Sequence, residues 1–356
     1  MVYKKAWIYF FVFSLTVVIS LAGEDQKEPI FAIAPRFDKA WLFSEGLAAV
    51  EIDGKCGYID TTGKIVIDPR FEEAADFSEG LSAVKIDGMW GFIDTSGTFV
   101  VEPKFQIDAW LSGPSRYIYG LKFSQGLTPV EINGKWGFID SSGNVAIGPK
   151  FGFAEPFSEG LARVRVDRIR GLKIGRWGYI DRSGDVVIKP KFDFTDNFSE
   201  GLSGVTIADK DGYIDKSGAI VIEPRFDDSL WFSQGLAPVE INVKWGFINT
   251  LGEVVIEPKF DDVRPFSFGL AAVQFDRKLW GFINQEGEFI IPPSFETAGS
   301  FYEGVAGVLI RDKFGFIDKD GNIVIEPRFE SIWYFSEGLA PVKFDGKWGY
   351  IKNPLN

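Results

Sequence analysis

Residues 69–103 read PRFEEAADFSEGLSAVKIDGMWGFIDTSGTFVVEP, and this phrase recurs nine times at a spacing of about 34 residues. Most copies keep a Pro-Lys/Arg-Phe step, a Phe-Ser-Glu-Gly-Leu segment, an aromatic-Gly strand and a later Gly turn. The copies that carry Trp before Gly are Trp90-Gly91, Trp136-Gly137, Trp177-Gly178, Trp245-Gly246, Trp280-Gly281 and Trp348-Gly349. Such a period is typical of an array in which neighbouring units bury each other's apolar faces, so we interpret these recurring residues as structural.

One copy predicts a small antiparallel sheet. Residues 81–86 and 90–94 are expected to form two strands joined by the turn Asp87-Gly88, because Asp-Gly supplies the positive φ angles that a two-residue hairpin requires. Residues 94–97 predict a second turn, opened by Asp and closed by Gly. The third strand is expected to stop at Pro103, which cannot donate a hydrogen bond. Each repeat is therefore predicted to be a three-stranded meander.

The Trp-Gly pair is expected to lie between neighbouring sheets. Trp245 and Trp280 are predicted to be largely buried, and Cys56, which replaces the Trp in the first repeat, is interpreted as a buried apolar substitute. The Gly after each Trp is expected to give clearance for an aromatic side chain of the next unit, because a bare backbone allows close approach.

For the whole array we predict an all-β fold in which nine repeats stack as a curved, open β-solenoid over residues 30–352, followed by a tail at 353–356. The alternative is a closed, propeller-like ring, in which residues 30–33 complete the last sheet beside residues 349–351. The open form is favoured because three strands and about 34 residues are few for a propeller blade of four strands.

The N-terminus predicts export. Lys4 and Lys5 precede an apolar run at residues 6–19, and small residues lead to a cleavage site after Ala22. We therefore expect a signal peptide at 1–22, a short linker at 23–29 and a periplasmic or extracellular chain without stable membrane insertion; an uncleaved anchor is the rival interpretation. The net charge of −12 disfavours nucleic acid as a partner, and the single Cys excludes an internal disulfide.

The repeated phrase, with its Lys-Trp-Gly-Phe-Ile-Asp centre and Phe-Ser-Glu-Gly-Leu lead-in, resembles the bacterial WG-repeat family, also called KWG repeats and abundant in Leptospira. The resemblance covers residues 30–351, nearly the whole chain after the predicted signal peptide. It implies an exported repeat protein that mediates interactions, and it supplies no catalytic residues.

The composition argues against the commonest kinds of catalytic site. The chain has no His, which removes Ser-His and Cys-His pairs and His metal ligands, and no phosphate-binding Gly loop is present. Recurrent acids have local structural explanations, and Gln or Phe replaces them in some copies. We therefore predict no enzyme activity, no metal and no cofactor, with a carbohydrate-processing enzyme that uses paired carboxylates as the alternative.

Two insertions interrupt the array in adjacent units. The third unit contains extra residues that include Trp110, Tyr117 and Tyr119. The first hairpin of the fourth unit is extended and basic. Its six cations are Arg163, Arg165, Arg168, Arg170, Lys173 and Arg176. Because insertions in repeat proteins often decorate the binding face, and aromatic and Arg side chains are enriched at binding hot spots, these nine residues form the predicted interaction site.

We expect both insertions to lie on the same rim and several of the cations to share a solvent-exposed face. The leading hypothesis is an exported, non-catalytic scaffold that binds a protein or glycan, with an acidic partner favoured by the basic hairpin. The alternatives are a tolerated loop beside a solvated hairpin, and a purely structural envelope protein.

Overall fold

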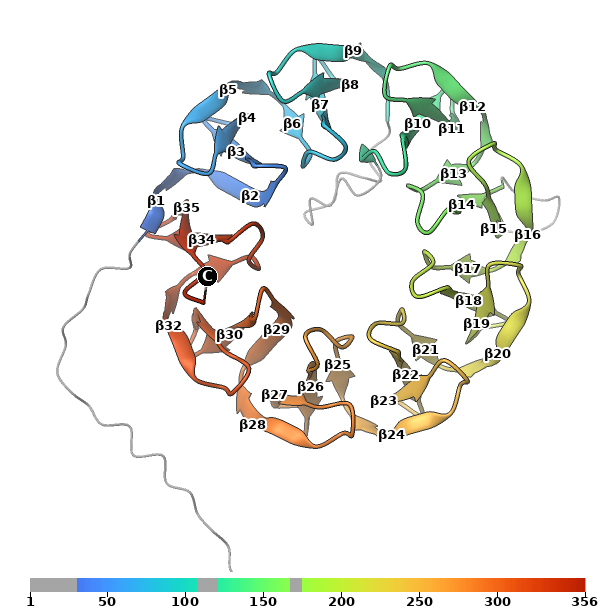
Figure 1. Ribbon diagram of the computed structural model, residues 1–356, viewed down its shortest axis with the longest axis vertical. Coiled ribbons are helices and arrows are strands. Elements are labelled where there is room, and N and C mark those ends of the chain that lie inside the picture. The colour runs from blue at the N-terminus through green and yellow to red at the C-terminus, as the bar shows by residue number, and fades with distance from the viewer. Residues whose placement is uncertain (1–30, 108–120, 167–174, 356) are drawn as a thin grey trace, which may run out of the picture. The chain divides into compact units, whose positions relative to one another are not determined.

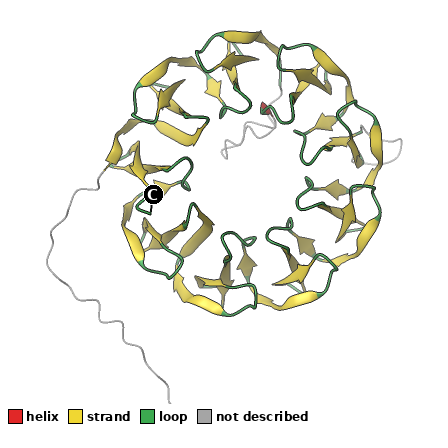
Figure 2. Ribbon diagram, in the orientation of Figure 1, coloured by secondary structure: helices red, strands yellow, loops and turns green. Residues whose placement is uncertain are grey.

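The computed structural model describes residues 31–107, 121–166 and 175–355, so the predicted signal peptide and linker lie outside the described residues. The unit that begins at Phe31 consists of nine antiparallel sheets arranged side by side around a central axis (Figure 1). We number these sheets as blades 1–9 in chain order. Strands supply almost all of the regular structure, and loops connect them on both faces of the ring (Figure 2).

The strand bounds follow the repeat. Blades 1–3 contain β2 (Lys39–Ser44), β3 (Leu47–Ile52), β4 (Lys55–Asp60), β5 (Ile65–Phe71); β6 (Glu73–Ala74), β7 (Leu81–Ile86), β8 (Met89–Asp94), β9 (Phe99–Phe105); and β10 (Leu127–Ile132), β11 (Lys135–Asp140), β12 (Val145–Phe151). Blades 4–6 contain β13 (Phe153–Ala154), β14 (Ala162–Arg165), β15 (Trp177–Ile180), β16 (Val186–Phe192); β17 (Phe194–Thr195), β18 (Leu202–Ile207), β19 (Lys210–Asp215), β20 (Ile220–Phe226); and β21 (Asp228–Ser229), β22 (Leu236–Ile241), β23 (Lys244–Asn249), β24 (Val254–Phe260). Blades 7–9 contain β25 (Asp262–Val263), β26 (Ala271–Phe275), β27 (Leu279–Ile283), β28 (Phe289–Phe295); β29 (Thr297–Tyr302), β30 (Val305–Ile310), β31 (Lys313–Ile317), β32 (Ile323–Phe329); and β33 (Ser331–Ile332), β34 (Leu339–Phe344), β35 (Lys347–Lys352) with β1 (Phe31–Phe37).

The predicted hairpin and turn are confirmed. In blade 2, β7 pairs with β8 in continuous register from Leu81–Asp94 to Ile86–Met89. Asp87 and Gly88 between them have φ angles of 49° and 74°. The carboxylate of Asp94 then accepts hydrogen bonds from the backbone N–H groups of Ser96 and Thr98, as the sequence of the turn predicts.

The three-strand prediction missed the innermost strand. In blade 2 this is β6, only two residues long, which pairs Glu73 with Lys85 and Ala74 with Val84. Eight of the nine described sheets have four strands, and blade 3 has three among its described residues. Two residues are too few to show an alternating pattern in the sequence, so the strand appears only once the chain is folded.

The Gly after each Trp has a different role from the one predicted. A Cβ atom on Gly91 would lie 2.6 Å from the carbonyl oxygen of Val101 and 2.8 Å from the nitrogen of Pro103. The outermost strand β9 runs on through Pro103 to Phe105, with register shifts that press its backbone onto this glycine. The glycine therefore makes room for the outermost strand of its own blade, and the predicted clearance for a neighbouring aromatic is wrong.

The open solenoid is also wrong, because the N-terminal strand closes a ring. β1 pairs with β35 antiparallel and gives blade 9 the order β1-β35-β34-β33 (Figure 1). A Cβ atom on Gly349 would lie 2.5 Å from the carbonyl oxygen of Ile33, so the last glycine receives the first strand as every other glycine receives its own blade's outermost strand. The fold is a nine-bladed β-propeller. A repeat of about 34 residues suffices for it because the innermost strand forms within the segment that links consecutive blades, with two residues in six of the blades and six residues in blades 1 and 8.

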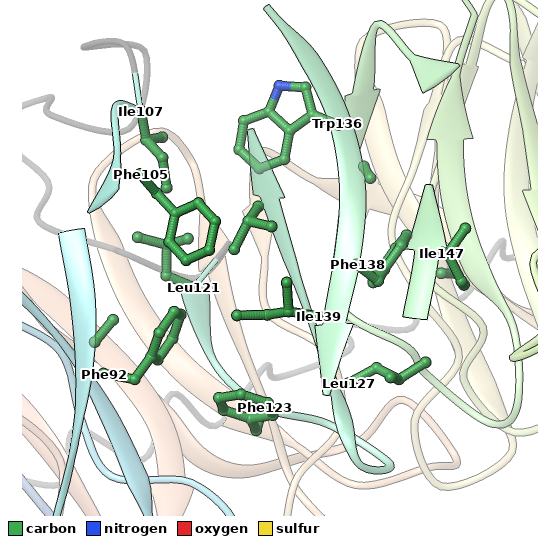
Figure 3. Close-up of a cluster of buried hydrophobic side chains, with 14 of the residues drawn as sticks. Phe92, Phe105, Ile107, Leu121, Phe123, Leu127, Trp136, Phe138, Ile139 and Ile147 are labelled. Atoms are coloured by element: carbon green, nitrogen blue, oxygen red, sulfur yellow. The ribbon is translucent and has the colours of Figure 1, made fainter. Parts of the chain in front are cut away.

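Apolar side chains fill the spaces between neighbouring blades. Figure 3 shows one such cluster, where Phe92 of blade 2 packs against Phe123 at a centroid distance of 5.2 Å, with Leu121 and Ile139 of blade 3 beside them. Trp136 and Phe138 of blade 3 instead pack against Phe153 and Phe157 of blade 4. The Trp prediction is confirmed for Trp280, which is 4% exposed, while Trp245 is only partly buried. Cys56 is fully buried, as expected for an apolar substitute.

Candidate functional site

The recurrent Ser of the Phe-Ser-Glu-Gly segment ties each blade to the next. Ser44 Oγ donates a hydrogen bond to the carbonyl oxygen of Phe77 in the following blade, at 2.8 Å. The same bond joins Ser78 to Phe123, Ser124 to Phe157, Ser158 to Phe198, Ser199 to Phe232, Ser233 to Phe266, Ser267 to Phe301 and Ser336 to Phe43. These hydroxyl groups are therefore used by the fold.

The recurrent Glu of this segment also joins its blade to the one that follows. The two carboxylate oxygens of Glu45 accept hydrogen bonds from the backbone N–H groups of Glu79 and Gly80 in the next blade, at 2.7 and 2.9 Å. Glu79, Glu200 and Glu337 make the same pair of bonds with the blade that follows each of them. These carboxylates hold blades together, which explains why they recur without being catalytic.

Of the predicted interaction site, six residues lie outside the described residues: Trp110, Tyr117, Tyr119, Arg168, Arg170 and Lys173. The three described cations are engaged within the fold. The guanidinium group of Arg163 pairs with Glu155, donates to the carbonyl oxygen of Thr195 and lies 5.0 Å from the ring centroid of Trp177. Its side chain is only 13% exposed, so the expected shared solvent face does not include Arg163.

The other two described cations are also paired. Arg176 forms an ion pair with Asp193 of blade 5. Arg165 lies over two aromatic rings, 5.8 Å from the centroid of Phe153 and 5.6 Å from that of Trp177. The sequence shows the cations but not these partners, because the partners come from neighbouring strands.

A pocket of about 650 Å³ opens beside the innermost strand β13 and spans blades 3–5. Its polar lining comes from Lys122, Ser124 and Gln125 of blade 3, Glu155, Ser158, Glu159 and Arg163 of blade 4, and Asn197 of blade 5. Of these, sequence reasoning placed only Arg163 in a candidate site. No departure from a consensus marks the pocket, because the position of Lys122 and Asn197 varies throughout the repeat: the other blades hold Leu42, Asp76, Pro156, Trp231, Pro265, Ser300 and Tyr334 there.

The wall of the pocket combines aromatic and polar groups. Phe153 packs between Trp136 and Trp177, with centroid distances of 4.9 and 5.9 Å. The side-chain amide of Asn197 donates a hydrogen bond of 3.3 Å to Glu155. Since Glu155 also pairs with Arg163, cations and acids are balanced on this wall.

Behind this wall lies a group of acids with unusual pKa values. Burial raises the pKa of Asp196 to about 6; Arg163 opposes the shift and Asp211 adds to it. Asp211 occupies the Trp position of blade 5, where burial raises its pKa although Thr206 and Ser229 donate hydrogen bonds to it at 2.8 and 3.0 Å. A Cβ atom on Gly204 would lie 2.7 Å from Asp196 Oδ2, so the glycine leaves space for this carboxylate.

Within residues 31–107, 121–166 and 175–355, no group of three or more Cys, Asp or Glu side chains is arranged to hold a metal ion. Across the same residues, no helix is long and apolar enough to cross a membrane.

A solved structure with a similar fold supports the ring. A crystal structure of the eukaryotic initiation factor superposes with a TM-score of 0.62 at 12% identity, covering 92% of this chain and 94% of that one. The computationally designed Ika8 protein has a TM-score of 0.45 at 11% identity, covering 90% and 96% of the two chains. BamB from Moraxella catarrhalis also has a TM-score of 0.45, at 8% identity, covering 89% and 98%. At these identities the likeness concerns the fold alone.

No curated protein matches the sequence. The model of the WG containing repeat family does match, at residues 31–56, 57–90, 90–106, 136–168, 177–210, 212–245, 245–278, 280–314 and 314–348. These nine matches extend over most of the ring. The chain belongs to the WG containing repeat family.

Proposed function

We propose that the protein is an exported, non-catalytic binding scaffold that holds a neutral glycan in the pocket of blades 3–5. The observation that carries the proposal is a pocket of about 650 Å³ whose lining combines hydroxyl, amide and charged groups. The Ser and Glu side chains that recur in the repeat join blades, and three of them, Ser124, Ser158 and Glu159, also line this pocket. Lys122, Gln125 and Asn197 add a cation and two amides to the same lining.

The chemistry of the pocket favours a neutral ligand rich in hydroxyl groups. Its volume lies in the range of small-molecule sites. The cations Lys122 and Arg163 are matched by acids, so the wall does not select a strongly charged ligand. The amides of Gln125 and Asn197 both donate and accept hydrogen bonds, as sugar hydroxyl groups require. The export signal expected at residues 1–22 is consistent with a ligand found outside the cytoplasm.

A carbohydrate-processing enzyme is the second candidate, because burial raises the pKa values of Asp196 and Asp211, and the charge of Asp211 adds to the shift of Asp196. Neither acid lines the pocket, and both oxygens of Asp211 accept hydrogen bonds from neighbouring hydroxyl groups. A structural role for this pair is therefore favoured. Release of reducing ends from a neutral polysaccharide by the wild type, lost in Asp196→Asn, would support the enzyme instead.

The binding proposal is tested with residues 23–356 on an array of neutral oligosaccharides, followed by calorimetry with the best binder. Asn197→Ala and Gln125→Ala are each expected to weaken binding by about tenfold, which corresponds to 1.4 kcal/mol. Gln234→Ala is the matched control, because Gln234 occupies the same repeat position as Gln125 but lies in blade 6. Absence of any neutral glycan ligand, or equal weakening by the control, would contradict the proposal.

A further inference from the structure

Two turns of each blade lie at the same end of the ring and touch across blade boundaries. We call the Phe-Ser-Glu-Gly segment the inner turn and the Asp-x-x-Gly segment the outer turn. Lys216 in the outer turn of blade 5 pairs with Glu159 in the inner turn of blade 4, at 3.0 Å. Gln285 of blade 7 likewise donates to the carbonyl oxygen of Gln234 in blade 6, at 2.9 Å. The two kinds of turn therefore form one continuous face.

Blades 6–8 place large apolar side chains on or beside this face. Leu251 is 75% exposed, Trp231 50%, Phe268 45% and Tyr302 39%. At the position of Leu251, blades 1–5 hold Thr62, Ser96, Ser142, Ser183 and Ser217. At the position of Phe268 they hold Glu45, Glu79, Gln125, Glu159 and Glu200, and at that of Tyr302 they hold Ser44, Ser78, Ser124, Ser158 and Ser199. We call Trp231, Leu251, Phe268 and Tyr302 the apolar arc.

Two of the polar contacts that recur between blades are missing at the arc. Phe268 has no carboxylate to accept the N–H groups of blade 8. Tyr302 has no short hydroxyl to reach blade 9, and it stacks on Tyr334 at a centroid distance of 4.0 Å instead. The four side chains of the arc stay 39–75% exposed, and exposed apolar patches of this kind mark interaction sites.

Acids outnumber cations around the arc. After the residue that opens each outer turn, blades 6–8 carry the exposed acids Glu253, Glu286, Glu288 and Asp320 and one cation, Lys319, whose Nζ lies 5.2 Å from the ring centroid of Phe268. The outer turns of blades 1–5 open with Asp60, Asp94, Asp140, Asp181 and Asp215 and also carry Asp185, against the three cations Lys64, Arg182 and Lys216. The face is therefore acidic across blades 1–8, and the arc adds apolar side chains to an acidic setting.

We infer that the apolar arc is a docking surface for a protein segment whose apolar side chains are flanked by Lys or Arg. Trp and Tyr supply the contact area that dominates protein interfaces, and the surrounding acids attract a cationic partner and discourage an acidic one. This surface lies in blades 6–8 and is independent of the glycan pocket in blades 3–5.

The probe is a 12-residue peptide of Leu, Trp and Lys, paired with a twin in which every Lys is replaced by Glu. Wild-type protein is expected to bind the Lys peptide, more weakly as salt rises, and to bind the Glu peptide at least about tenfold more weakly. The triple variant Leu251→Ser, Phe268→Glu, Tyr302→Ser introduces the residue types of blades 1–5. It is expected to weaken binding of the Lys peptide by at least about tenfold.

The same variant controls for folding, because it restores a Ser and a Glu at positions where they join blades. Its melting temperature is expected to equal or exceed that of the wild type. Val145→Ser with Val186→Ser, which removes exposed apolar groups from the outermost strands of blades 3 and 4, should leave peptide binding unchanged. Equal binding by wild type and the triple variant, no binding by the wild type, or preference for the Glu peptide would overturn the inference.

Discussion

Two junctions between neighbouring blades show how the repeat is used. At the closing junction, where blade 9 meets blade 1, Ser336 donates to Phe43 at 2.8 Å, and Glu337 accepts from Glu45 and Gly46 at 2.7 and 2.9 Å. At the junction between blades 7 and 8 the Ser bond survives, but Phe268 stands where the carboxylate would be.

The seam between the two ends of the chain is therefore as complete as a junction within it. The two contacts that are lost lie at the junctions of blade 7 with blade 8 and of blade 8 with blade 9, in the part of the ring that carries the apolar arc. This difference teaches that the polar contacts of the repeat are kept where closure needs them, and that their absence elsewhere marks a surface with another use.

Removal of the closing strand should have the largest effect. Deletion of residues 24–37 takes away β1, which pairs with β35 and fills the last interface with Ile33 and Phe37, both buried. We expect the cooperative thermal transition of the whole ring to be lost. Deletion of residues 1–23 is the control and should leave the transition in place. A variant without 24–37 that melts like the wild type would show that the closing junction is dispensable.

The junction between blades 7 and 8 should depend on its apolar core. Trp280 packs there with Phe282 and Phe301. Trp280→Ala is expected to lower the free energy of unfolding by about 3–5 kcal/mol in chemical denaturation. The exposed Trp231 is the matched control, and Trp231→Ala should change it by less than about 0.5 kcal/mol. Similar effects of the two substitutions would contradict the packing described here.

A single added methyl group should destabilise the closing blade 9 and an internal blade equally. Gly349→Ala and Gly91→Ala each place a Cβ within 2.6 Å of a carbonyl oxygen in the outermost strand. Each is expected to cost about 1–3 kcal/mol of stability, measured by denaturant unfolding. Gly148→Ala has open space around its Cβ and serves as the control. A tolerated Gly349→Ala beside a destabilising Gly91→Ala would mean that the seam is looser than an internal sheet.

The carboxylate bonds should make a smaller contribution. Glu337→Ala removes two hydrogen bonds from the closing junction and is expected to cost about 1 kcal/mol. Phe268→Glu supplies the missing acceptor at the junction between blades 7 and 8 and should raise the melting temperature. A fall in melting temperature for Phe268→Glu would show that the phenylalanine stabilises the ring.

The smallest effect concerns pH. At the position of Trp41, which lies beside the closing junction, blade 5 holds Asp196, whose pKa burial raises to about 6 from an ordinary value of 3.8. From pH about 4 to about 6 the folded chain keeps a proton that the unfolded chain has released, so stability falls as pH rises through this window. Asp196→Asn should therefore raise the melting temperature above pH 6 and have little effect below pH 4. A difference independent of pH would contradict the shift.

Much of the local structure was predictable, because it follows from short stretches of chain. Asp87-Gly88 and Asp94 specify turns through their own backbone preferences, and the recurrence of Trp at the position of Trp280 indicates burial. The ring was predicted only as the alternative to the open solenoid, because the two-residue strand Glu73–Ala74 is too short to form a pattern in the sequence. Without that strand each repeat appeared to have three strands, which are few for a propeller blade.

The candidate sites show the same limit. The sequence reveals Arg163 as one of a run of cations, but Glu155 neutralises it only in the folded chain. Lys122 and Asn197 occupy a position that varies throughout the repeat, and nothing in the sequence says that this position lines a pocket. The nine-residue site predicted from the insertions stays a prediction for the six residues outside the described part of the chain.

Closure of the ring is tested most directly by a distance between blades 9 and 1. Spin labels are attached to Lys55→Cys with Lys347→Cys in one protein and to Lys55→Cys with Met89→Cys in another, because these residues hold the same position in blades 1, 9 and 2. The native Cys56 is fully buried and is not expected to take up a label. A closed ring predicts the same distance distribution for both pairs in a double electron–electron resonance measurement. A clearly longer distance between positions 55 and 347 than between positions 55 and 89 would contradict it.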